Sequence, residues 1–208
     1  ILGNQLVELA LLDDAARLEH QDVVSRADRA EAVGDDQPGG VHAIEAAADH
    51  KGPCYVRTGR NKVPVLFGPD YQFKIGKAHV FHEGRDAAII ATGILVAEAL
   101  KARETLLGEG IDAGVINMST IKPLDDEAVK AAAKRCGAIV TAEEHSIIGG
   151  LGSAVAEVLA ESAPATLVRV GVRDQFGTSG EPDGLLAHYK LSATDLAAAV
   201  KAAIKKKR

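Results

Sequence analysis

Two carboxylates and an imidazole stand next to one another in the second half of the chain, at Glu143, Glu144 and His145. They follow a short apolar run, residues 138–140, that has the character of a buried strand. Parallel α/β sheets often place working groups at strand ends, and a histidine beside a carboxylate can act as a general acid–base pair. A structural or interface role for His145 is the alternative, and the residue types leave both open.

A glycine-rich turn follows directly, with glycines at positions 149, 150 and 152. Apolar residues then recur at helical spacing, at Leu151, Ala154, Val155, Val158 and Leu159. The stretch is typical of a strand, a tight turn and an amphipathic helix. Free N–H groups at such a helix start can cradle a phosphate. The plainer interpretation, that the glycines let strand and helix approach closely, is favoured because this glycine spacing is a weak motif.

The elements that position this turn alternate regularly along the chain. Strands are predicted at residues 87–92, 113–118, 138–141 and 166–170, with helices after each of them. Asp125 is expected to cap the start of one helix and Gly137 to end it, and residues 192–195 resemble a capping box. This alternation predicts a three-layer α/β fold, a mostly parallel sheet with helices on both faces.

The composition is that of an ordinary globular protein. Of 208 residues, 47% are hydrophobic and only 3% aromatic, so Ala, Val, Leu and Ile must build the core. A net charge of −5 argues against a nucleic-acid or anionic-membrane partner, since both bind basic surfaces. The longest apolar run, residues 87–97, is too short to cross a bilayer. Cys54 and Cys136, two isolated cysteines, indicate a reduced cytoplasmic protein.

The first forty residues differ from the rest of the chain. They hold nine acids, three arginines, no lysine and no Phe, Trp or Tyr, whereas residues 41–208 hold twenty acids and twenty-one bases. We predict that residues 1–40 are foreign to the fold; a divergent helical extension is the alternative. The chain starts with Ile1 rather than methionine, which indicates a section of a longer protein.

Five blocks of the sequence resemble transketolase-type thiamine diphosphate enzymes, in that family's order. They are GPCYVRTGRNKVPV (52–65), ATGILVAEAL (91–100), VINMSTIKPLD (115–125), EEHSIIGGLGSAVAEVLAE (143–161) and VRDQFGTSGEP (172–182). Several ordered blocks at compatible spacing are more specific than any single motif, and the resemblance covers residues 43–201. Two of the sequence motifs, EEHSIIGGLGSA and KPLD, favour transketolase over 1-deoxyxylulose-5-phosphate synthase or the beta chain of a 2-oxo-acid dehydrogenase.

The resemblance implies a division into three parts. Residues 1–40 stand outside the family. Residues 41–76 close the pyrimidine-binding domain with a helix (41–50) and a strand (54–58), followed by a linker. Residues 77–208 are the C-terminal domain.

The implied activity is two-carbon ketol transfer between sugar phosphates, as in the pentose phosphate pathway, with thiamine diphosphate and Mg²⁺ as cofactors. In the family both cofactors sit on a preceding domain, with a Gly-Asp-Gly motif that this chain lacks. We therefore expect this chain alone to bind neither cofactor, to supply no catalytic or metal-binding residue, and to be inactive by itself. It would work in a homo- or hetero-oligomer, such as a dimer, with the N-terminal domains or subunit.

Arg57 is the one residue to which the resemblance gives a substrate-binding role. By its position in YVRTGR it is similar to a family arginine that binds the substrate phosphate, and a guanidinium suits a terminal phosphate. A surface ion pair is the alternative, and Arg60 is the next candidate. Since the family's C-terminal domain supplies no catalytic group, a structural or interface role is favoured for His145. An inter-domain or inter-subunit contact is favoured for the loop of residues 173–180.

A non-catalytic dimerisation or regulatory α/β module is the rival interpretation of the whole chain. It predicts that no accompanying gene encodes the diphosphate and pyrimidine domains, whereas the transketolase interpretation predicts such a partner.

Overall fold

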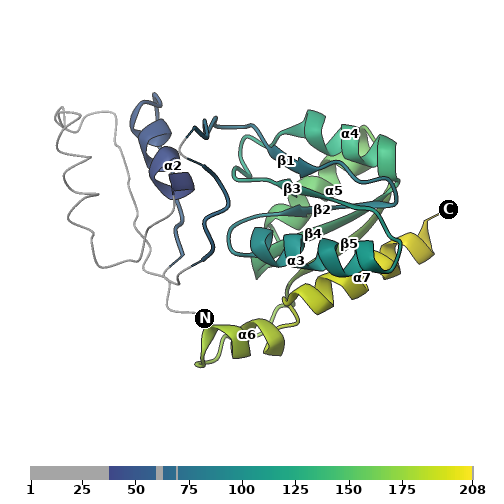
Figure 1. Cartoon of the computed structure of the whole chain (residues 1–208). Coiled ribbons are helices and arrows are strands. Elements are labelled where there is room, and N and C mark those ends of the chain that lie inside the picture. The colour runs from purple at the N-terminus through teal and green to yellow at the C-terminus, as the bar shows by residue number, and fades with distance from the viewer. Residues whose placement is uncertain (1–37, 60–62, 69, 208) are drawn as a thin grey trace. The chain divides into compact units, whose positions relative to one another are not determined.

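The computed structural model describes residues 38–59, 63–68 and 70–207. These residues fall into two compact units that succeed one another in the sequence at Gly76 (Figure 1). Of the segment predicted as foreign, residues 1–40, only the last three are among those described. Arg60 also lies outside the described residues.

Helix α2, Pro38–Ala48, is the only regular element among the described residues of the first unit. It begins three residues before the predicted helix because proline is well tolerated in a first helical turn. The strand predicted over residues 54–58 is wrong, since no described residue before His79 belongs to a strand. Exposure still alternates there, with Tyr55 and Arg57 more exposed than their neighbours. The side chains of this segment alternate in exposure as those of a strand do, but no described strand lies beside it to form hydrogen bonds with it.

The second unit is built around a sheet whose described strands number five. They are β1 His79–His82, β2 Ala87–Ala91, β3 Ala113–Asn117, β4 Ala138–Ser146 and β5 Thr166–Val172. In space they follow the order β1-β3-β2-β4-β5. Strands β2 to β5 run parallel and only β1 pairs antiparallel, with β3. The mostly parallel sheet is confirmed. Strand β1 was not predicted, because four residues are too few to show a periodic pattern of apolar residues.

Helices cover both faces of this sheet (Figure 1). Helices α3, Leu95–Gly108, and α7, Ala193–Lys206, pack on each other and on one face. Helices α4, Asp126–Cys136, and α5, Leu151–Glu161, pack together on the other face. The short helix α6, Pro182–His188, lies between β5 and α7 in the chain. The predicted three-layer α/β fold is therefore confirmed.

Three predicted helix caps are confirmed in atomic detail. The Asp125 carboxylate accepts a hydrogen bond from the Ala128 N–H at 3.3 Å, and Gly137 ends α4 in the left-handed region with φ 64°. Ser192 and Asp195 form a complete capping box at the start of α7. Local signals of this kind stabilise helix ends whatever the rest of the fold does, which is why they can be recognised in sequence.

The core is aliphatic, as the scarcity of aromatic residues requires. All five residues of β2 are fully buried, and Ile116, Met118, Ile139, Leu151 and Val155 fill the space between the sheet and helices α4 and α5. Among the described residues, no helix combines the length and apolar character needed to cross a membrane.

Candidate functional site

Strand β4 carries the acidic and imidazole side chains into the glycine turn. It was predicted to end at Thr141, but it continues to Ser146. Pairing with β5 explains the extension, because Ser146 lies opposite Val172 and the Ile147 N–H donates to the Val172 carbonyl at 3.0 Å. Glu143 to His145 therefore lie on the strand itself, and the turn begins after them.

Glu143 is buried, with only 1% of its surface exposed, and it faces the start of helix α5. One carboxylate oxygen, Oε2, accepts a hydrogen bond from the Leu151 N–H at 2.8 Å. The other oxygen, Oε1, accepts from the Gly152 N–H, also at 2.8 Å. Both amides belong to the first turn of α5, whose N–H groups have no partner within the helix. Glu143 thus supplies the anion that this helix terminus attracts.

The glycines permit this approach. A Cβ on Gly150 would overlap the Glu143 carboxylate, and a Cβ on Gly152 would press on the side chains of Arg169 and Thr141. The interpretation of the glycines as a close-approach device is confirmed for Gly150 and Gly152, whereas Gly149 has open space around an added Cβ and a positive φ of 76°. The phosphate-cradle alternative is not supported, because the amides of Leu151 and Gly152 already donate to Glu143.

The electrostatics of Glu143 reflect two opposing effects. Burial raises the pKa of its carboxyl above the usual 4.5, because the charged form loses its hydration. The N–H groups of Gly152 and Leu151, and then the charges of His145 and Arg169, act in the opposite direction. Burial is the larger influence, so the folded protein holds this proton more tightly than the unfolded chain does.

Arg169 completes the site and was not singled out from the sequence. It stands in β5, and its guanidinium donates to the Ile147 carbonyl at 2.8 Å. Its side chain passes over Gly152, beside the buried Thr141. A lone arginine in the mostly apolar run TLVRVGV was the available signal, since a charge that is partly buried among apolar residues needs a partner.

His145 is exposed near the end of β4, whereas Glu143 on the same strand is buried. Its Nδ1 is 3.2 Å from the carbonyl oxygen of Ser146. No described hydrogen bond joins His145 to Glu143, whose two oxygens accept from the Leu151 and Gly152 N–H groups. A structural or interface role for His145 stays a prediction.

The loop of residues 173–180 follows β5 and is exposed throughout. The Arg173 guanidinium donates to the Arg169 carbonyl at 3.3 Å. The Tyr189 hydroxyl donates to the Phe176 carbonyl at 3.1 Å, while the Phe176 side chain is 98% exposed. The backbone at Phe176 is thus held while its ring faces solvent.

Arg57, the predicted substrate-binding residue, belongs to the first unit and is exposed on an extended segment. The Glu143 site belongs to the second unit. Its role in phosphate binding remains a prediction.

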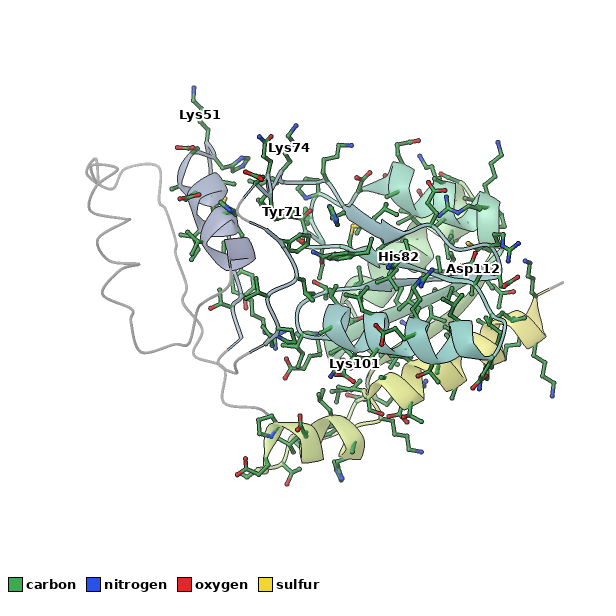
Figure 2. All side chains as sticks on the ribbon, viewed as in Figure 1. Lys51, Tyr71, Lys74, His82, Lys101 and Asp112 are labelled. Carbon is green, nitrogen blue, oxygen red and sulfur yellow. The ribbon has the colours of Figure 1, made fainter. Side chains whose placement is uncertain are left out.

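A second polar cluster lies where β2 and β3 begin, around Asp112 (Figure 2). The Arg85 guanidinium donates to the Asp112 carboxylate at 3.1 Å, and Arg103 lies 3.6 Å from its other oxygen. Burial, and then the charge of Arg103, lower the pKa of neighbouring His82. The Asp112 N–H also donates to Asp86 at 2.7 Å, so the cluster ties the starts of two strands together.

The glycine turn of the second unit does not fit a diphosphate group. A diphosphate would need free amides at the glycine turn, where the Glu143 carboxylate is already bound. Within the described ranges, no three or more His, Cys, Asp or Glu side chains are grouped so as to hold a metal ion.

Comparison with known proteins places this fold and site in a family. Residues 76–196 match the family described as transketolase, C-terminal domain. The 6-deoxy-6-sulfo-D-fructose transketolase subunit SqwH of Clostridium sp. (strain MSTE9) is 50% identical over 147 residues, 71% of this chain and 46% of that protein. A putative transketolase C-terminal section of Methanocaldococcus jannaschii is 43% identical over 168 residues, 79% of this chain and 52% of that protein.

A solved structure described as a split gene transketolase, inactive beta4 tetramer, is also similar. Its TM-score is 0.78 with 50% sequence identity, over 80% of this chain and 55% of that one. The chain thus spans about half the length of these relatives. Because the matched pattern covers more than half of the chain, including β4, the glycine turn and α5, this protein belongs to the transketolase C-terminal domain family.

Proposed function

We propose that this chain is the C-terminal section of a two-carbon ketol transferase that acts on sugar phosphates. One observation carries the proposal: relatives that are 50% and 43% identical are named as a transketolase subunit or a C-terminal section, and this chain spans about half of each. The Glu143 site supports the same assignment. Its polar groups bind one another, so it acts as scaffold rather than as a reaction centre.

The reacting groups then belong to a partner. In this proposal a chain or domain with the N-terminal half holds thiamine diphosphate and Mg²⁺, which supply the carbanion chemistry of ketol transfer. Residues 41–76 complete the pyrimidine-binding domain of the assembly, and residues 77–208 form the C-terminal domain. Arg57 binds the terminal phosphate of the sugar, since an exposed guanidinium can form two parallel hydrogen bonds to it.

Reconstitution tests the proposal directly. The full chain is mixed with the product of a neighbouring gene that carries the Gly-Asp-Gly cofactor motif, and transfer from a ketose phosphate to an aldose phosphate is measured. We expect activity only when both chains, thiamine diphosphate and Mg²⁺ are present.

Isothermal titration of the isolated chain with thiamine diphosphate and Mg²⁺ is the matched control, and we expect no binding. Micromolar binding by this chain alone would contradict the assignment. A neighbouring gene product that binds the chain without producing any ketol transfer would favour the non-catalytic module instead.

A further inference from the structure

A pocket of about 410 Å³ opens at the edge of the sheet where the parallel strands begin. Three segments line it: Asp86 just before β2, the turn of residues 110–111 shortly before β3, and the C-terminal end of α7. Asp112, which Figure 2 labels, follows this turn and marks the same end of the sheet. Because β2 and β4 run parallel, the Glu143 site lies at the opposite edge. Pockets of about 300–1,000 Å³ are typical of sites for small molecules, so this one has room for a single small ligand.

Lysine side chains dominate the polar lining of this pocket. Lys201, Lys205 and Lys207 all contribute to it. The Lys201 ammonium is paired with the Glu109 carboxylate at 2.5 Å. Within the part of the chain that the structure describes, no carboxylate forms an ion pair with Lys205 or Lys207. Two cations without such a partner are complementary to the charge of a phosphate group.

Lys207 is positioned by the backbone around it. Its N–H donates to the carbonyls of Ala203 and Ile204, both at 3.1 Å. Its side chain passes over Gly137, where an added Cβ would come within 2.9 Å of the Lys207 Cε. Packing of this aliphatic stem restricts the side chain, so less conformational freedom is lost when the ammonium binds an anion.

The rest of the lining suits the carbon skeleton and the hydroxyl groups of a polyol. Ile111 and Ile204 supply apolar surface. Asp86 supplies a carboxylate, whose Oδ2 accepts from the Asp112 N–H at 2.7 Å. A carboxylate has capacity for about four hydrogen bonds, so Asp86 can also accept one from a ligand hydroxyl.

We propose that this pocket binds a small phosphorylated polyol, whose phosphate contacts Lys205 and Lys207 and whose hydroxyl group donates to Asp86. Lysines in a last helical turn also offset the negative end of the helix dipole. Lys206 separates the two roles, because it belongs to the same turn of α7 but does not line the pocket. The dipole involves all three lysines alike, whereas the pocket uses only Lys205 and Lys207. The site requires neither thiamine diphosphate nor ketol transfer.

Isothermal titration of the full chain, with no partner or cofactor present, tests the proposal. The probes are ribose 5-phosphate and fructose 6-phosphate, and we expect at least one of them to bind. Lys205→Ala and Lys207→Ala should each raise its dissociation constant by about tenfold or more, as loss of a charge-assisted contact does. Lys206→Ala is the matched control and should bind as the wild type does. Arg57→Ala should also bind normally, which separates this pocket from the proposed substrate phosphate contact.

Backbone amide resonances supply the second readout. Those of Gly110 and Ile111 should shift when the probe is added, whereas those of Gly149 and Gly150, at the other edge of the sheet, should not. No binding of either sugar phosphate at millimolar concentration would overturn the proposal, as would equal weakening by Lys206→Ala. Inorganic phosphate that binds as tightly as the sugar phosphates would overturn the assignment to a polyol. Since the titration uses this chain alone, its result is independent of whether reconstitution yields ketol transfer.

Discussion

Gly150 lies so close to the carboxylate of Glu143 that any Cβ at position 150 would overlap it. The Ser146 carbonyl oxygen would lie 2.9 Å from the same Cβ, so a methyl group there would meet backbone as well as side-chain atoms. This contact joins the end of β4 to the start of α5, and it makes the glycine a requirement of packing rather than of ligand binding.

Gly150→Ala should therefore destabilise the second unit. Overpacking in a rigid site costs about 1–3 kcal/mol, and Glu143 can move only by giving up its bonds to Leu151 and Gly152. Urea unfolding followed by circular dichroism measures the change. Gly108→Ala is the control, because nothing lies within 4 Å of its added Cβ. Equal stability of the two variants would show that the turn can relax around the methyl group.

The titration of Glu143 should be visible in the pH dependence of stability. Because burial raises its folded pKa above 4.5, the folded state binds the proton more tightly than the unfolded chain. The free energy of unfolding should therefore fall as the pH rises from 4.5 through the raised pKa. Glu143→Gln removes this titration and should flatten the profile in that range.

The same variant should also weaken the hydrogen bonding between β4 and the start of α5. An amide group in place of one carboxylate oxygen turns a donor toward a donor, which costs about 1–3 kcal/mol. Glu157→Gln, on the exposed side of α5, is the control and should reproduce the wild-type profile. If Glu143→Gln and the wild type have the same profile, the titration of Glu143 does not cause the pH dependence of stability.

Asp125 should contribute more than an ordinary helix cap. Besides capping α4 through the Ala128 N–H, it accepts from the Ala78 N–H at 3.0 Å and lies 3.7 Å from the Lys77 ammonium. Asp125→Ala should lower the free energy of unfolding by about 2 kcal/mol, at the upper end for a cap. Asp125→Asn keeps an acceptor for the cap and should cost less. Thermal denaturation of both variants measures the difference. If both lose the same free energy of unfolding, the negative charge of Asp125 and not its capping oxygen stabilises the protein.

Arg57→Ala tests the proposed substrate phosphate contact in the reconstituted enzyme. Loss of a charge-assisted contact should weaken transfer from phosphorylated donors by about 2–3 kcal/mol, through KM. Turnover of an unphosphorylated donor should hardly change. Lys51→Ala, another exposed cation of the first unit, serves as the control. Equal effects of Arg57→Ala on both donors would exclude Arg57 from phosphate binding.

Much of the fold could be predicted because its signals are local. Asp125, Gly137 and the capping box at Ser192 act on residues within one helical turn, so they can be recognised without tertiary contacts. The apolar runs of β2 and β3 likewise required burial on both faces, and hence helices on both sides of the sheet. Residues 54–58 have a strand's alternation, but a strand also needs a neighbour, which lies outside local sequence.

By itself the sequence determined the α/β class, the caps and the family to which the chain belongs. Only the tertiary structure decided what the glycine turn does. A free amide and an amide bound by Glu143 are identical in sequence, and only folding brings that carboxylate to Leu151 and Gly152. The role of Arg169 was hidden for the same reason, because its partner carbonyl at Ile147 is 22 residues away in the chain and becomes a neighbour only when β5 pairs with β4.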